Sequence, residues 1–140
     1  MARTSRSDTS SKHSASNSHQ DCIEKCLLCY ETCLQMAMNH CLEKGGKHVA
    51  PEHFRLMINC SEICRTTADF MISSSAVHAP VCAACAEVCD ACAESCDDLS
   101  MDECARICRS CAESCRATAG DVQILGAEAE VTGVSPQRPM

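Results

Sequence analysis

The chain of 140 residues has almost no aromatic side chains: it contains no Trp, one Tyr and two Phe. A core without rings needs another supply of apolar, polarisable volume, and sulfur can provide it. Long apolar runs are also missing, which argues against a membrane-spanning helix. The net charge of −7 excludes the broad basic surface that nucleic-acid binding requires.

The first twenty residues lack the pattern of an export signal. They are rich in Ser, contain no apolar segment, and Arg3 and Arg6 are not adjacent, so neither a Sec nor a twin-arginine signal is recognised. We therefore expect a cytoplasmic protein. Because thiols are kept reduced in that compartment, abundant cysteine indicates metal or redox chemistry before it indicates a disulfide scaffold.

Helical patterning falls into four segments, at about 21–44, 51–73, 77–97 and 100–119, separated by breakers such as Gly45-Gly46. The length permits one domain, and short connections make neighbouring helices antiparallel. We predict an all-α fold, an up-down-up-down antiparallel four-helix bundle over residues 21–118. A disordered Ser-rich tail over 1–20 and a flexible tail over 119–140 are expected to flank it.

The sequence is most unusual in its 16 cysteines and in the steps between them. Cys22, Cys26, Cys29 and Cys33 are separated by steps of four, three and four, which is the a/d repeat of a helix seam. The same steps lead on to Met36 and His40, and leave Cys41 off the alternation. The seams of the other three segments are His53, Met57, Cys60, Cys64, Thr67 and Met71; then His78, Cys82, Cys85, Cys89, Cys92 and Cys96; and then Met101, Cys104, Cys108, Cys111, Cys115 and Thr118. We therefore predict a Cys-lined lumen.

The spacing within each seam favours metal binding over cross-linking. Residues three or four apart on a helix have Cβ atoms about 5–6 Å apart, whereas a disulfide needs about 3.5–4.5 Å. Two thiolates at that separation can hold one metal ion between them. Single buried cysteines usually act as small apolar residues, but fifteen on four seams exceed what packing alone would explain.

The set of Cys, Met and His ligands selects Cu(I), zinc or an iron–sulfur cluster. A structural zinc site needs about four ligands, and the ferredoxin run Cys-x₂-Cys-x₂-Cys-x₃-Cys-Pro is absent from the sequence. Buried thiolates also require neutralisation, which one Cu(I) ion per thiolate supplies. We therefore expect Cu(I), with a capacity on the order of fifteen ions per chain.

The antiparallel arrangement assigns the ends of the lumen. One end gathers Met36, His40, Cys41, His53, Met57, Cys96, Met101 and Cys104, and its weaker His and Met donors predict the entrance for copper. The other end gathers Cys22, Thr67, Met71, His78, Cys82, Cys115 and Thr118. His13, His19 and His48 lie in a tail or a loop, where we expect them to be solvated.

The runs Cys22-x₃-Cys26-x₂-Cys29-x₃-Cys33 and Cys82-x₂-Cys85-x₃-Cys89-x₂-Cys92-x₃-Cys96 resemble those of the four-helix-bundle bacterial copper storage proteins. The resemblance covers about residues 21–118. It implies Cu(I) held by lumenal thiolates in a homotetramer of bundles. The family has exported and cytosolic branches, and because a twin-arginine signal is not recognised, the resemblance implies the cytosolic branch. The second helix departs from a fully thiol-lined wall, because it carries only Cys60 and Cys64.

We thus expect storage and detoxification of copper, without catalysis and with a copper chaperone as a possible partner. The expected ligands are all sixteen cysteines with His40, His53, His78, Met36, Met57 and Met101. Two other functions remain open at this point. One is an iron–sulfur, ferredoxin-like electron carrier, and the other is a thiol-redox buffer.

Overall fold

The structure, a computed structural model, describes residues 14–120. Residues 1–13, with His13, and residues 121–140, which make up most of the tails predicted over 1–20 and 119–140, lie outside the described residues. The elements in chain order are α2 (Ser14–Gln35), the π-helix η1 (Met36–Cys41), α3 (Leu42–Lys44), the 3₁₀ helix η2 (Gly46–Val49), α4 (Pro51–Ile72), α5 (His78–Asp98) and α6 (Asp102–Ala119). Residues 14–120 contain no strand, and none of their helices has the length and apolarity needed to cross a membrane.

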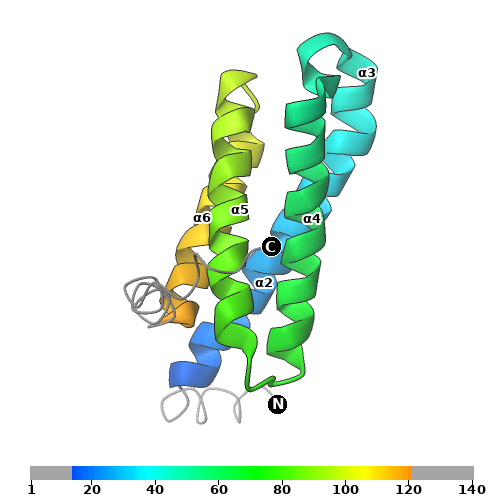
Figure 1. Ribbon diagram of the computed structural model, residues 1–140. Helices are drawn as coiled ribbons and strands as arrows, with labels where there is room; N and C mark the ends of the chain where they lie inside the picture. Colours follow the sequence, from blue (N-terminus) through cyan, green and yellow to red (C-terminus); the bar gives the residue numbers. More distant parts are fainter. Residues whose placement is uncertain (1–13, 121–140) are drawn as a thin grey trace, which may run out of the picture.

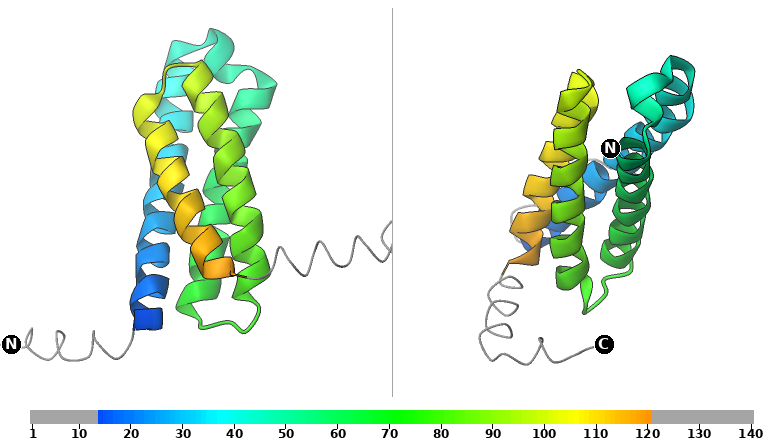
Figure 2. Two further views of the ribbon diagram at one scale, coloured as in Figure 1. Left: turned by 90° about the vertical axis from the view of Figure 1, so that its left-hand side faces the viewer. Right: turned by 45° about the horizontal axis from the view of Figure 1, so that its top comes forward.

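The helices form a four-helix bundle (Figure 1). α2 continues through η1 into α3 as one long helical segment, and α4, α5 and α6 follow it up and down the bundle (Figure 2). α2 packs against α4 and α6, and α5 packs against the same two helices, so α2 lies diagonally across from α5. The predicted all-α antiparallel bundle is confirmed.

The helix ends follow the local sequence. Gly45 ends α3 with a φ of 69°, a left-handed conformation that only glycine adopts without steric cost. Pro51 begins α4 at a first-turn position, where its missing N–H is not needed. The observed bounds of α4, α5 and α6 lie within two residues of the predicted ones.

The first helix begins at Ser14, seven residues before the predicted start at Asp21, so residues 14–20 belong to α2 and not to a disordered tail. No Gly or Pro interrupts this stretch. The ring of His19 also contacts that of His78 at the start of α5, with centroids 5.0 Å apart. This contact between α2 and α5 stabilises the first turns of α2, which the helix propensity of residues 14–20 alone does not predict.

Small side chains flank the cysteines and let the four helices approach closely. Ala37, Ala68, Ala93 and Ala112 are fully buried. Outside, Arg109 pairs with Asp97 at 2.5 Å between α6 and α5. Because exposed pairs of this kind contribute little to stability, the bundle is held mainly by its packed interior.

The π-helix η1 corrects the predicted seam at the end of the first helix. A π turn accommodates one more residue than an α turn, so the inward positions after Cys33 are Ala37 and Cys41, both fully buried. Met36 and His40, which a regular helix would direct inward, are only half-buried. Cys41 is therefore a seam residue, and its apparent irregularity in the sequence is the mark of the π turn.

The π turn predicts an unusual tolerance to deletion. Removing the exposed Met38 converts the step from Ala37 to Cys41 into an ordinary helical step of three, so we expect the bundle to fold with Cys41 still buried. Removing the exposed Glu31 instead rotates the rest of the helix by about 100° and displaces Cys33 from the interior. The rate at which thiols react with Ellman's reagent measures the difference. Equal reactivity in the two variants would contradict the assignment.

Candidate metal centre

All sixteen cysteines lie within the described residues, and all are buried as free thiols. Their sulfurs meet across the bundle axis. Cys29 Sγ of α2 lies 3.7 Å from Cys60 Sγ of α4 and 3.8 Å from Cys108 Sγ of α6. Cys64 Sγ of α4 lies 3.5 Å from Cys89 Sγ of α5. The interior is thus a continuous column of sulfur to which all four helices contribute.

Within the column, four groups of four thiols have sulfurs that all lie within 4.8 Å of one another. The groups overlap, since Cys29 and Cys60 belong to two of them and Cys64 and Cys89 also belong to two. The full sets are Cys26, Cys85, Cys111 and Cys115; Cys29, Cys33, Cys60 and Cys108; Cys29, Cys60, Cys64 and Cys89; and Cys64, Cys85, Cys89 and Cys111.

The spacing of the sulfurs suits metal ions better than disulfides. Neighbouring Sγ atoms lie 3.5 to 4.0 Å apart, whereas a disulfide requires about 2.05 Å. Three sulfurs bound to one ion at about 2.3 Å lie about 4.0 Å from one another. The thiols therefore already stand close to the separation of a trigonal thiolate site.

Burial opposes the ionisation of every thiol in the column, and this favours protonated thiols in the metal-free protein. Contacts with Cys104 and Cys108, followed by burial, raise the pKa of Cys33 well above its usual range. Contacts with Cys111 and Cys29, followed by burial, do the same to the pKa of Cys64. Binding a cation in this column must therefore release protons.

At the predicted entrance, an imidazole approaches the end of the column. His53 is 4% exposed, and its Nε2 lies 3.6 Å from Cys41 Sγ. Its Nδ1 lies 2.7 Å from Ser95 Oγ of α5, which fixes the orientation of the ring. Burial, followed by the neighbouring His48, lowers the pKa of His53, so the ring is neutral near pH 7 and can offer a lone pair. Burial also raises the pKa of Cys41.

His48, predicted to be solvated, is half-buried and stands between two other imidazoles. Its ring centroid lies 5.1 Å from that of His40 and 6.3 Å from that of His53. The three rings form a row that leads from the surface to Cys41. Sequence spacing gave no sign of this, because His48 belongs to the short η2 helix outside the repeating seams.

Thioethers adjoin the thiols at both ends of the column. Met57 Sδ lies 3.6 Å from both Cys92 Sγ and Cys96 Sγ. Met71 Sδ lies 3.7 Å from Cys82 Sγ at the opposite end. Of the residues predicted as ligands, His53, Met57, Met101 and all the cysteines are buried, whereas Met36, His40 and His78 are half-buried.

The wall of α4 is interrupted at Thr67. This residue is fully buried at a seam position, but its hydroxyl donates to Ile63 O at 2.7 Å within its own helix. It therefore presents no free hydroxyl proton to the lumen. The second helix therefore departs from a fully thiol-lined wall at this position, where Thr67 takes the place of a thiol.

The fold and this interior define an all-helical protein whose core is a thiol-lined column suited to soft metal ions. The family model for copper storage proteins matches residues 15–120. The chain belongs to the copper storage protein family.

Solved structures give the same assignment. A protein of Nitrosospira multiformis is 58% identical, with a TM-score of 0.73, over 74% of this chain and 95% of that one. The Cu(I)-bound copper storage protein BsCsp3 is 32% identical, with a TM-score of 0.68, over 74% and 99%. The apo form of copper storage protein 3 from Bacillus subtilis is 33% identical, with a TM-score of 0.61, over 72% and 98%. Comparison with curated proteins gave no match.

The raised thiol pKa values predict how the stability of the metal-free protein depends on pH. A group whose pKa rises on folding stabilises the fold below its unfolded pKa, and this stabilisation is lost as pH rises through the folded pKa. For Cys33, Cys41 and Cys64 the loss begins above about pH 8.5, the unfolded value. We expect the free energy of unfolding, measured in guanidinium under reducing conditions, to lose less with rising pH above that value in Cys41→Ser than in the unaltered chain. An equal loss in the two chains would contradict the argument.

Proposed function

We propose that this chain stores Cu(I), binding many ions through the thiolates of its lumen. The observation that carries the proposal is the continuous sulfur column, in which thiols of four helices stand 3.5 to 4.0 Å apart in an interior closed to water. Soft thiolates prefer Cu(I), and an ion that accepts two or three shared sulfurs can fill such a column along its length. Family membership and the copper-bound relative support this assignment.

Storage follows from charge balance. Each Cu(I) ion that replaces a thiol proton leaves the column neutral, so the filled core avoids the cost of buried charge. At one ion per thiolate, the capacity is on the order of fifteen ions per chain. A divalent ion at the same ratio would leave the core strongly positive, which disfavours zinc as the cargo. The proposed ligands are the sixteen cysteines, with Met57, Met101 and His53 at the entrance end.

The entrance, in this proposal, is the end that carries His40, His48 and His53. Neutral imidazoles bind Cu(I) without the charge of a thiolate and therefore release it more easily. The row of rings brings an ion from the surface to within reach of Cys41, whose sulfur lies 3.6 Å from His53 Nε2. The thioether of Met57, which lies 3.6 Å from both Cys92 Sγ and Cys96 Sγ, then adjoins the thiols of α5 at this end.

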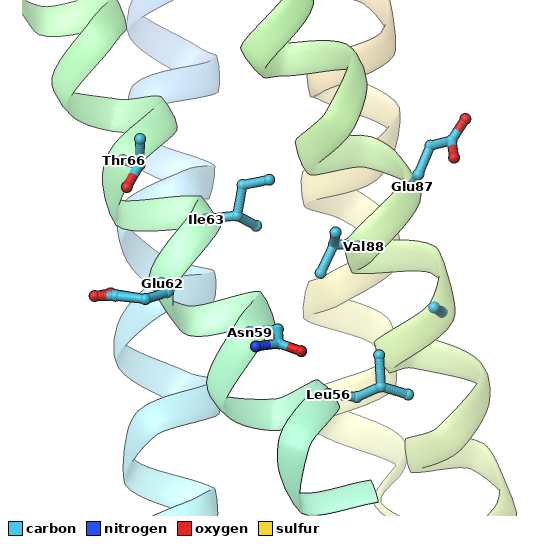
Figure 3. Close-up of a pocket in the computed structure, with 8 residues that line it drawn as sticks. Leu56, Asn59, Glu62, Ile63, Thr66, Glu87 and Val88 are labelled. Carbon is cyan, nitrogen blue, oxygen red and sulfur yellow. The ribbon is translucent and has the colours of Figure 1, made fainter. Parts of the chain in front are cut away.

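The proposed setting is the cytoplasm, where a reducing environment keeps sixteen thiols available, with a copper chaperone as the delivering partner and no catalytic role. We also propose a homotetramer. An apolar groove of about 530 Å³ lies on the outer face between α4 and α5, where Leu56, Ile63 and Val88 line it (Figure 3). A second copy of the chain would cover these side chains. Light scattering of the purified chain measures the mass that tests this assembly.

Anaerobic titration of the reduced chain with Cu(I), against a strong competing chelator, tests the proposal. We expect saturation on the order of fifteen ions per chain. Cys64→Ser, which removes a thiol shared by two groups, should lower the capacity, whereas Ser110→Ala on the outer part of α6 should not. Saturation at one or two ions would indicate a chaperone or a regulator, and stoichiometric iron with visible cluster absorption would indicate an electron carrier.

The entrance is tested by the rate of loading. Replacing His40, His48 and His53 with Ala should slow the uptake of Cu(I) from a chelator, while the capacity falls by no more than the ions those rings hold themselves. The expected reason is the loss of intermediate ligands before Cys41. Stopped-flow mixing measures the rate of uptake. The control variant Ser110→Ala keeps all three histidines and should load at the rate of the unaltered chain. Uptake at the unchanged rate would defeat the assignment of the rings.

A further inference from the structure

A second pair of imidazoles lies at the opposite end of the bundle from His53. The start of α2 and the connection between α4 and α5 meet there (Figure 1). His19 stands three residues before Cys22, and His78 stands four residues before Cys82, so both histidines continue a cysteine seam outward by one turn. Their ring centroids lie 5.0 Å apart with an interplanar angle of 64°. His19 was predicted to be solvated, but it is half-buried.

The ring of His78 is oriented for binding. Its Nδ1 lies 3.0 Å from Ser75 O, and a carbonyl oxygen can only accept, so Nδ1 carries the proton and donates. The lone pair is therefore on Nε2. Metal-binding histidines commonly have this arrangement, in which a backbone carbonyl fixes the tautomer and the other nitrogen binds the ion.

The two rings border a cavity of about 220 Å³ that reaches toward the thiols. His19, Phe70, Met71, Ser74, Ser75 and His78 line it. Met71 is 5% exposed, and its sulfur lies 3.7 Å from Cys82 Sγ. The cavity thus brings two half-buried imidazoles and one thioether together, and the thioether adjoins the first thiol of α5.

We propose that His19, His78 and Met71 form a second Cu(I) site, which acts as a port at this end of the column. The proposal rests on the storage function proposed above. A thioether is a soft donor and imidazole suits copper, and because both are uncharged ligands they hold Cu(I) without neutralising its charge. Transfer to Cys82 replaces a neutral donor with a thiolate and releases its proton, which makes movement into the column favourable.

The port gives the bundle two openings, one at each end. Loading through either end delivers ions to different thiols: Cys41 at the first end and Cys82 at the second. The interrupted wall at Thr67 lies near the second opening, where a complete ring of thiolates would hold an arriving ion more tightly. A weaker wall at this place keeps the ion exchangeable before it enters the column.

Loading kinetics of the full chain test the port. His19→Gln with His78→Gln should lower the rate of Cu(I) uptake to about half, because the two ends load in parallel. Combined with the substitutions of His40, His48 and His53, it should lower the rate about tenfold or more. Gln20→Ala, an exposed neighbour of His19, is the matched control and should leave the rate unchanged. A combined variant that loads as fast as the first-end variant alone would overturn the port.

Two further measurements separate this outcome from others. Filling the lumen first and then adding one equivalent of Cu(I) should shift the ¹⁵N resonance of His78 Nε2, and an unshifted resonance would count against the site. Capacity and helical circular dichroism of each variant show whether it has folded. A wild-type capacity of one or two ions would defeat the storage function itself, whereas an undiminished capacity with unaltered rates would defeat only the port.

Discussion

Sixteen thiols share one dry interior, and the rest of the structure follows from the need to keep that interior uncharged. Without metal the charge is avoided by protonation, which burial promotes. With Cu(I) it is avoided by one cation for each thiolate. Both states require that water and carboxylates stay outside. The acidic residues between 14 and 120 accordingly lie on the outer faces of the helices, where Asp97 pairs with Arg109.

The same constraint sets the packing. A column of sulfur leaves no room for rings at the axis, so alanines such as Ala68 and Ala93 complete the interior, and larger apolar side chains such as Ile63 and Val88 lie at the flanks. The flanking residues also form the outer groove between α4 and α5 (Figure 3). The placement of small side chains at the axis and larger apolar side chains at the flanks therefore gives the chain both a metal-binding core and an apolar outer surface.

Most of the fold and the column could be predicted from the sequence, because steps of three and four place side chains on one face of a helix wherever the turn is regular. The prediction failed where the turn is not regular: the π-helix exchanges Met36 and His40 for Ala37 and Cys41. It also failed where contacts between separate helical elements decide the structure. His48 lies against His40 and His53, and His19 lies against His78, and no periodicity within one helix records such contacts.

The overlap among the four-thiol groups has a statistical consequence. An ion bound at Cys29 and Cys60 fixes two of the sulfurs that the next group also uses, and the same holds at Cys64 and Cys89. Neighbouring sites of this kind are not independent, and a one-dimensional array with nearest-neighbour coupling describes them better than a set of separate equilibria. Where an ion already present arranges the sulfurs for the next, a partly filled chain carries its copper as contiguous runs, and growth of a run is easier than starting a new one.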